Sequence, residues 1–298
     1  MVPLGLLLAA LAGGAFSFAP VRLGALVLAG RSPVCPLRQA VQCESHAKRL
    51  RETKDRILAA SRLIREDPEG FRLWQTPNGR YWIPRGADYV LPFNLSEQVN
   101  NIYGVGRQAV QAGDIVLDCG ANVGVYTRKA LDAGAKLVVA IEPAPENLEC
   151  LRRNFPAEIA AGQVIVYPKG VWDKDDFLTL NVAPGNPAAD SFVIQPEGSH
   201  PGGKLPLTTI DKLVKELDLA RVDYIKMDIE GAEQRALIGA RETLAQFRPR
   251  LALSSYHRPD DPEKIPQLVR HAWPGYRMEC GPCAYVNGHI RPDVLYFR

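Results

Sequence analysis

The stretch from residue 113 to residue 127 constrains the fold of this chain more than any other. It holds an uninterrupted apolar run, residues 115–117, which is followed by the carboxylate of Asp118 and by a loop that contains two glycines. Such a run is typical of a parallel strand buried on both faces. Glycine lets the backbone approach a ligand closely, and the first N–H groups of a helix predicted over about residues 123–131 would point at the same place. The sequence therefore predicts a strand, a loop and a helix that hold a small cofactor.

The glycine spacing argues against a dinucleotide as that cofactor. A GxGxxG fingerprint would require glycine at positions 122 and 125, where the chain has Asn122 and Val125. A nucleoside without a pyrophosphate is therefore favoured. Glu142 follows a second apolar run, residues 137–141, and lies where an acidic group would meet ribose hydroxyls. The alternative is that Asp118 and Glu142 only cap the helices that follow them.

Three further strings make a family resemblance specific. They are DxGANxGxxT at residues 118–127, TTID at residues 208–211 and KxDxEGAE at residues 226–233. With them the chain resembles the FkbM family of S-adenosylmethionine-dependent methyltransferases over about residues 97–257. The resemblance implies a class I methyltransferase fold, which is an α/β, Rossmann-like, seven-stranded and mostly parallel sheet flanked by helices. It also implies S-adenosyl-L-methionine as cofactor and methylation that is usually at oxygen.

The candidate site residues fall into two sets. The predicted cofactor-binding set lies in the glycine loop and after the second strand: Asp118, Gly120, Ala121, Asn122, Gly124, Thr127 and Glu142. The candidate catalytic set follows later strands: Lys226, Asp228, Glu230 and His257. Because ligands of open α/β sheets bind at the carboxyl ends of the strands, both sets are expected to face one crevice.

An alcohol acceptor must lose its proton during methylation, so the site needs a base. His257 follows the apolar run at residues 250–254 and is the first candidate, and Asp228 is the second. Family members often carry an acidic residue before this histidine, whereas this chain has serines at 254 and 255, so a role for that position does not carry over. The structural alternative is an ion pair between Lys226 and Asp228, or helix capping by Asp228 and Glu230. These two carboxylates are also too few to indicate a cation site, so no metal is predicted.

The N-terminal 30 residues differ in character from the rest. Residues 2–21 carry no charge, and apart from Arg22 the apolar character continues to residue 30. This length predicts a membrane anchor, with a cleaved signal as the alternative. The arginines at 22, 31 and 38 precede any acidic residue, which predicts a catalytic domain on the cytoplasmic side. A protein free in the cytoplasm is the alternative.

Residues 31–70 are predicted to form an amphipathic helical linker, with the helix over 42–66, and residues 71–298 the methyltransferase domain. Two expected hairpins flank the domain. One joins residues 71–74 to 80–83 and would cover the cleft or close a sheet edge, and one turns at residues 287–288. Residues 173–203 contain strand-like pieces at 177–180 and 192–194 and are typical of an insertion near an acceptor site.

The cysteines do not indicate redox chemistry. Cys280 and Cys283 form a CxxC pair without the long helix that a thioredoxin site requires. A metal half-site, a local disulfide and free thiols remain open, and a cytoplasmic location favours thiols here and at Cys35 and Cys43.

The charge balance bears on the partner. The net charge is +3, from 36 basic and 33 acidic residues, without a dense basic stripe, so nucleic acid is not a predicted partner. The predicted acceptor is a small-molecule, glycan or lipid-linked hydroxyl. A nicotinamide-dependent oxidoreductase and a non-catalytic cofactor-binding protein are the alternative functions.

Overall fold

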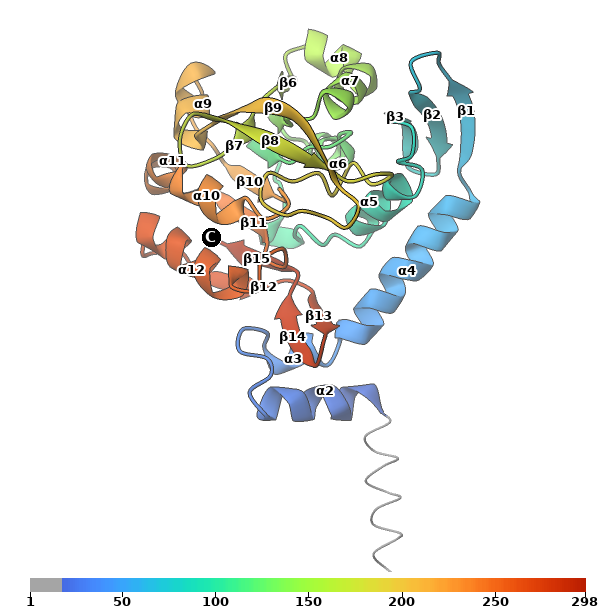
Figure 1. Ribbon diagram of the computed structural model, residues 1–298. Helices are drawn as coiled ribbons and strands as arrows, with labels where there is room; N and C mark the ends of the chain where they lie inside the picture. Colours follow the sequence, from blue (N-terminus) through green and yellow to red (C-terminus); the bar gives the residue numbers. More distant parts are fainter. Residues whose placement is uncertain (1–17) are drawn as a thin grey trace, which may run out of the picture.

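A seven-stranded sheet forms the centre of the computed structural model, which describes residues 18–298 (Figure 1). The strand order is β12-β15-β11-β10-β4-β5-β6, and β15 alone runs in the direction opposite to the other six strands. The predicted fold class is therefore confirmed. The strands are β4 (Ile115–Cys119), β5 (Leu137–Ile141), β6 (Val164–Tyr167), β10 (Tyr224–Met227), β11 (Arg250–Ser254), β12 (Met278–Cys280) and β15 (Val294–Phe297).

Helices cover both faces of this sheet. They are α5 (Val90–Val99), α6 (Val125–Asp132), α7 (Pro145–Asn154), α8 (Pro156–Ala160), α9 (Ile210–Glu216), α10 (Glu233–Ile238), α11 (Arg241–Phe247) and α12 (Asp261–Ala272), with a 3₁₀ turn, η1 (Gly106–Gln108). Alternate strand residues enter the two halves of the core, since side chains alternate along a strand. Leu117 and Ile225 belong to one apolar cluster, and Val116 and Tyr224 belong to another. Lys226 is in register with Asp118, so both lie on the face of Tyr224.

A separate three-stranded sheet precedes the central one. The predicted hairpin is present as β2 (Arg72–Thr76) and β3 (Gly79–Ile83), and β1 (Arg62–Glu66) pairs with β2. The predicted helix is therefore too long: α4 spans Cys43–Ala59, and residues 62–66 gain backbone hydrogen bonds from β2 instead. Asn154 ties β3 to α7 through both backbone groups of Trp82, at 2.7 and 3.0 Å. The hairpin contributes no residue to the cleft described below.

The insertion forms a third sheet from β7 (Gly170–Val171), β8 (Asp176–Val182) and β9 (His200–Thr208). Residues 177–180 lie in β8 as predicted. Residues 192–194 are not a strand, because the hydroxyl of Ser191 accepts hydrogen bonds from Val193 N (3.0 Å) and Ile194 N (2.8 Å) and turns the chain.

The N-terminal helices α2 (Ala19–Leu28) and α3 (Leu37–Ala40) pack on the C-terminal hairpin of β13 (Cys283–Val286) and β14 (His289–Pro292) (Figure 1). The hairpin was predicted, but the disulfide that ties it to the N-terminal segment was not. Cys35 forms a disulfide with Cys283 across 248 positions, since the packing brings their Cα atoms to 6.5 Å. The prediction of free thiols is wrong for this pair, whereas Cys43 and Cys280 are free.

The predicted membrane anchor over residues 1–30 lies largely outside the described residues. Its described part is the ten-residue helix α2. Within residues 18–298, no helix has both the length and the apolar character required to cross a membrane.

Candidate functional site

Two adjoining cavities lie at the carboxyl ends of β4, β5 and β10. The larger has a volume of about 290 Å³ and the smaller about 70 Å³. Both are lined by Gly120, Asn122, Asp228 and Glu230, so they are two parts of one cleft. The larger cavity is also lined by Phe93, Glu97, Tyr103, Lys226 and Tyr256. The smaller one is also lined by Glu142, Pro143, Val171, Asp190 and Phe192.

Glycine is required at two positions of the loop after β4. Gly120 has φ +78°, and a Cβ there would lie 1.9 Å from the carbonyl oxygen of Asp228. Gly124 has φ +89°, and its Cβ would lie 2.2 Å from the ring of Phe155. Asn122 between them has φ +50°, a conformation that asparagine tolerates better than most residues. The loop therefore brings bare backbone against β10 and opens it to the cleft.

Glu142 is held by the backbone on both oxygens. Oε2 accepts a hydrogen bond from Asn122 N and Oε1 one from Ala144 N, each at 2.9 Å. Burial raises the pKa of Glu142 to about 7, although these two N–H groups favour its ionised form. The carboxylate thus faces the smaller cavity with a fixed orientation.

Asp118 and Thr127 lie beneath the loop and line neither cavity. The Thr127 hydroxyl donates to Asp118 Oδ2 at 2.7 Å, and both residues are fully buried. Lys226 Nζ lies 3.4 Å from Asp118 Oδ1 and donates to the Gly120 carbonyl at 2.9 Å. The ion pair of Lys226 in this structure is therefore with Asp118, its register partner, rather than with Asp228. These three side chains support the loop from below.

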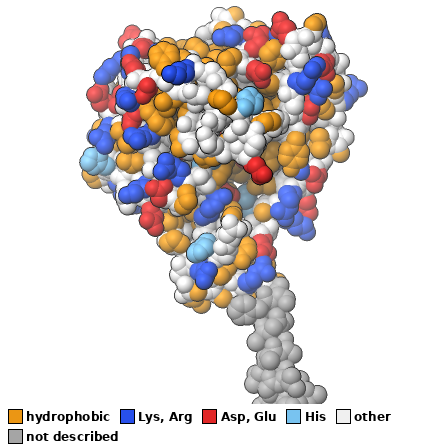
Figure 2. All heavy atoms as spheres, viewed as in Figure 1, with side chains coloured by type: hydrophobic (Ala, Val, Ile, Leu, Met, Phe, Trp, Pro, Cys, Tyr) orange, Lys and Arg blue, Asp and Glu red, His pale blue; other side chains and the backbone are white. Residues whose placement is uncertain are grey.

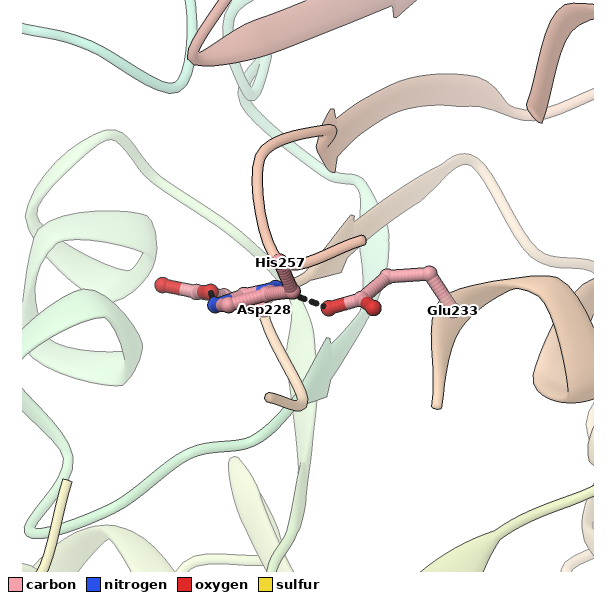
Figure 3. Close-up of side chains that lie close together, drawn as sticks. All are labelled: Asp228, Glu233 and His257. Atoms are coloured by element: carbon pink, nitrogen blue, oxygen red, sulfur yellow. Dashed lines mark hydrogen bonds and ion pairs between the residues drawn. The ribbon is translucent and has the colours of Figure 1, made fainter. Parts of the chain in front are cut away.

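His257 lies among the carboxylates of Asp228, Glu230 and Glu233. Figure 3 shows the first and the last of these beside the ring. Its Nδ1 is 2.9 Å from Glu233 Oε1, and its Nε2 is 3.5 Å from Asp228 Oδ1 and 3.4 Å from Glu230 Oε1. Glu233 is fully buried and the His257 side chain is 4% exposed. Glu230 reaches the ring from a backbone with φ +52°, a left-handed conformation that is uncommon outside glycine and often found at functional sites.

The carboxylates set the charge of this histidine. Burial lowers the pKa of His257, but Glu233, Glu230 and Asp228 outweigh it and raise the pKa to about 11. Burial raises the pKa of Asp228, but His257, Lys226 and a hydrogen bond from Tyr103 together hold it below its usual value. These shifts favour an imidazolium at His257 and a carboxylate at Asp228 near neutral pH.

Sequence reasoning missed several groups of the larger cavity. The Tyr103 hydroxyl donates to Asp228 Oδ2 at 2.6 Å, and the Tyr256 ring lies against His257 with centroids 4.1 Å apart. Glu97 of α5 is buried, and burial raises its pKa well above the ordinary range. Tyr256 adjoins His257 in the sequence, and this position could have indicated that it belongs to the site. Tyr103, by contrast, lies 125 positions before Asp228. No local pattern marks that contact.

The predicted site residues thus divide by position. Those that line the cleft are Gly120, Ala121, Asn122, Glu142, Lys226, Asp228 and Glu230. Those that lie behind its walls are Asp118, Gly124, Thr127 and His257. The roles assigned to all of them stay predictions.

Comparison with known proteins identifies the family to which this chain belongs. The family model of the methyltransferase FkbM domain matches residues 118–278, more than half of the chain. The chain belongs to the FkbM methyltransferase family. The matched region of this FkbM family member includes the glycine loop, Glu142, Asp228 and His257. The wall of the larger cavity formed by α5 and Tyr103 precedes that region.

Solved structures with similar folds include two methyltransferases. The FkbM methyltransferase of Methylobacillus flagellatus KT is 19% identical with a TM-score of 0.48, and the match covers 72% of this chain and 55% of that one. The precorrin-6y C5,15-methyltransferase of Geobacter metallireducens GS-15 is 15% identical with a TM-score of 0.39, covering 67% and 84%. This chain therefore spans about half of the length of the Methylobacillus structure. A search of curated proteins found no match.

Proposed function

We propose that this chain uses S-adenosylmethionine to methylate a hydroxyl group of a small-molecule, glycan or lipid-linked acceptor. The observation that carries the proposal is the Glu142 carboxylate, oriented by Asn122 N and Ala144 N beside a loop where glycine is required. Membrane attachment through residues 1–30, with the domain on the cytoplasmic side, stays a separate prediction.

The cofactor side of this proposal is the loop and the smaller cavity. Glu142 would accept hydrogen bonds from the ribose hydroxyls, and the apolar walls at Pro143, Val171 and Phe192 suit an adenine ring. The backbone of Gly120 and Ala121 would hold the amino-acid end, since both residues line the larger cavity and Gly120 lets the loop lie against Asp228. When bound, S-adenosylmethionine would supply an electrophilic methyl group on a sulfonium, so the protein would mainly orient the reactants and exclude water.

The acceptor side is the larger cavity. A hydroxyl placed beside Asp228 can give its proton to Oδ1 as its oxygen attacks the methyl carbon, because this atom has no hydrogen-bond donor within the described chain. Tyr103 holds the other oxygen, Oδ2, and so fixes the carboxylate. His257 is the first candidate from the sequence, but its carboxylate neighbours raise its pKa to about 11 and so oppose proton uptake near neutral pH. We therefore favour Asp228 as the base.

A labelled-methyl assay tests the proposal. Purified protein with S-adenosylmethionine labelled at the methyl carbon is offered panels of sugars, lipid-linked sugars and small alcohols, and the products are examined by NMR for a methyl ether. Asp118→Ala and Glu142→Ala serve as variants that lose cofactor binding. Label found on nitrogen or carbon would contradict the oxygen specificity while leaving the methyl donor intact.

A further inference from the structure

The cluster around His257 is short of positive charge and of hydrogen-bond partners. Three carboxylates surround one imidazolium, and the nearby ammonium of Lys226 is paired with Asp118. Asp228 Oδ1, Glu233 Oε2 and His257 Nε2 are buried without a hydrogen-bond partner in the described residues. Buried polar atoms are normally paired, so unpaired atoms of neighbouring side chains, such as Asp228 Oδ1 and His257 Nε2 at 3.5 Å, indicate a missing ligand.

The distances within the cluster suit a metal ion better than hydrogen bonds. The separations from His257 Nε2 to Asp228 Oδ1 and Glu230 Oε1 are 3.5 and 3.4 Å, beyond a good N–H···O contact. Two atoms that each lie about 2.1 Å from a zinc ion at a tetrahedral angle are about 3.4 Å apart.

Glu233 gives His257 the orientation that a metal ligand needs. An ionised carboxylate can only accept, so the contact of Glu233 Oε1 with Nδ1 at 2.9 Å places a proton on Nδ1. When Nε2 loses its proton, its lone pair is free and points toward Asp228 and Glu230. A carboxylate behind a histidine in this manner is the usual outer partner of a metal-bound imidazole.

We propose that Asp228, Glu230 and His257 form a site for a divalent transition-metal ion such as Mn²⁺ or Zn²⁺, with Glu233 as a positioning residue. The imidazole suits Zn²⁺ and the two carboxylates suit Mn²⁺, whereas Mg²⁺ and Ca²⁺ prefer sites made of oxygen alone. Asp228 and Glu230 also line the larger cavity, so an open coordination position there can take an acceptor oxygen. With the ion bound, Asp228 Oδ1 would be a ligand, and the ion would promote loss of the acceptor proton in its place. That use rests on the proposed function, whereas metal binding itself does not.

Titration of the metal-stripped protein with Mn²⁺, followed by EPR, and with Zn²⁺, followed by calorimetry, tests the site without any acceptor. We expect one saturable site. Glu230→Gln and His257→Gln should each weaken binding by tenfold or more. Glu233→Gln should weaken it by about tenfold, as outer partners of metal ligands do. His289→Gln, an exposed histidine of β14, is the matched control and should bind as the unaltered chain does.

S-adenosylhomocysteine binding, measured on the same samples, shows that each variant is folded. Glu230→Gln keeps the test valid where His257→Gln fails to fold, because the Glu230 side chain is 25% exposed and its substitution disturbs the core less. Absence of saturable metal binding in a protein that still binds S-adenosylhomocysteine would overturn the metal site and leave the proposed function standing. Metal binding that survives both Glu230→Gln and His257→Gln would also overturn it.

Discussion

The two sides of the cleft differ in how completely the chain satisfies them. On the cofactor side, both oxygens of Glu142 are bonded to backbone N–H groups, and the glycine loop rests on Asp118 and Lys226. On the acceptor side, Asp228 and His257 each keep a buried atom that has no hydrogen-bond partner among residues 18–298. The polar groups of the cofactor side have their hydrogen-bond partners within the chain, whereas those of the acceptor side leave positions for a ligand to fill. Changes on the two sides should therefore affect S-adenosylhomocysteine binding very differently.

The largest loss should follow Gly120→Ala. Its Cβ would lie 1.9 Å from the Asp228 carbonyl, so the loop must leave β10 and the cofactor cradle must distort. We expect affinity for S-adenosylhomocysteine to fall by about 100-fold or more, or about 2.7 kcal/mol. Gly162→Ala is the matched control, because Gly162 has φ +69° with no atom within 4 Å of its Cβ. Calorimetry that finds equal affinity in the two variants would contradict this account of the loop.

A smaller loss should follow acidification. The pKa of Glu142 is raised to about 7, and ribose hydroxyls donate to the ionised form, so affinity should increase as the pH rises through 7. One unit below and one unit above that value the ionised fractions are about one tenth and nine tenths, which predicts about tenfold weaker binding at pH 6 than at pH 8. Glu142→Gln should remove most of this dependence. A dependence that is unchanged in the variant would assign it to another group.

Substitution on the acceptor side should barely change cofactor affinity. Asp228→Asn keeps the size of the side chain and leaves the backbone contact with Gly120 in place. We expect S-adenosylhomocysteine binding within about threefold of the unaltered chain, while methyl transfer falls by about 100-fold or more if Asp228 is the base. A large loss of cofactor affinity would show that the two sides are not separable.

The disulfide should affect stability alone. The Cys35–Cys283 disulfide joins the segment just before α3 to the C-terminal hairpin. Neither cysteine lines the cleft. Cys35→Ser should lower the free energy of unfolding by about 2–4 kcal/mol in urea titrations and leave cofactor affinity unchanged. Mass spectrometry of alkylated, unreduced protein from its cells checks the bond itself. Fully alkylated Cys35 and Cys283 would indicate the reducing cytoplasm, and a linked peptide would indicate an oxidising compartment.

The sequence was most informative where structure is local. The glycine loop and the parallel strands follow from patterns a few residues long, and the structure has them as predicted. Residues 62–66 and 192–194 were assigned wrongly because a pairing partner in one case and the Ser191 hydroxyl in the other decide their conformation.

The acceptor side was less predictable, because it is assembled from distant segments. His257 and Asp228 were identified from strand ends, but the contact of Tyr103 with Asp228 and the bond between Cys35 and Cys283 depend on tertiary packing. Likewise, nothing in the spacing shows that Glu233 turns toward His257 rather than toward solvent.

Calorimetric titration of the purified protein with S-adenosylhomocysteine, beside NAD as the competing cofactor, tests the central claim most directly. The geometry of Glu142 and the glycine loop predicts one saturable site for S-adenosylhomocysteine and none for NAD. Binding of NAD, or no binding of S-adenosylhomocysteine by the folded protein, would contradict the claim that this cleft holds the methyl donor.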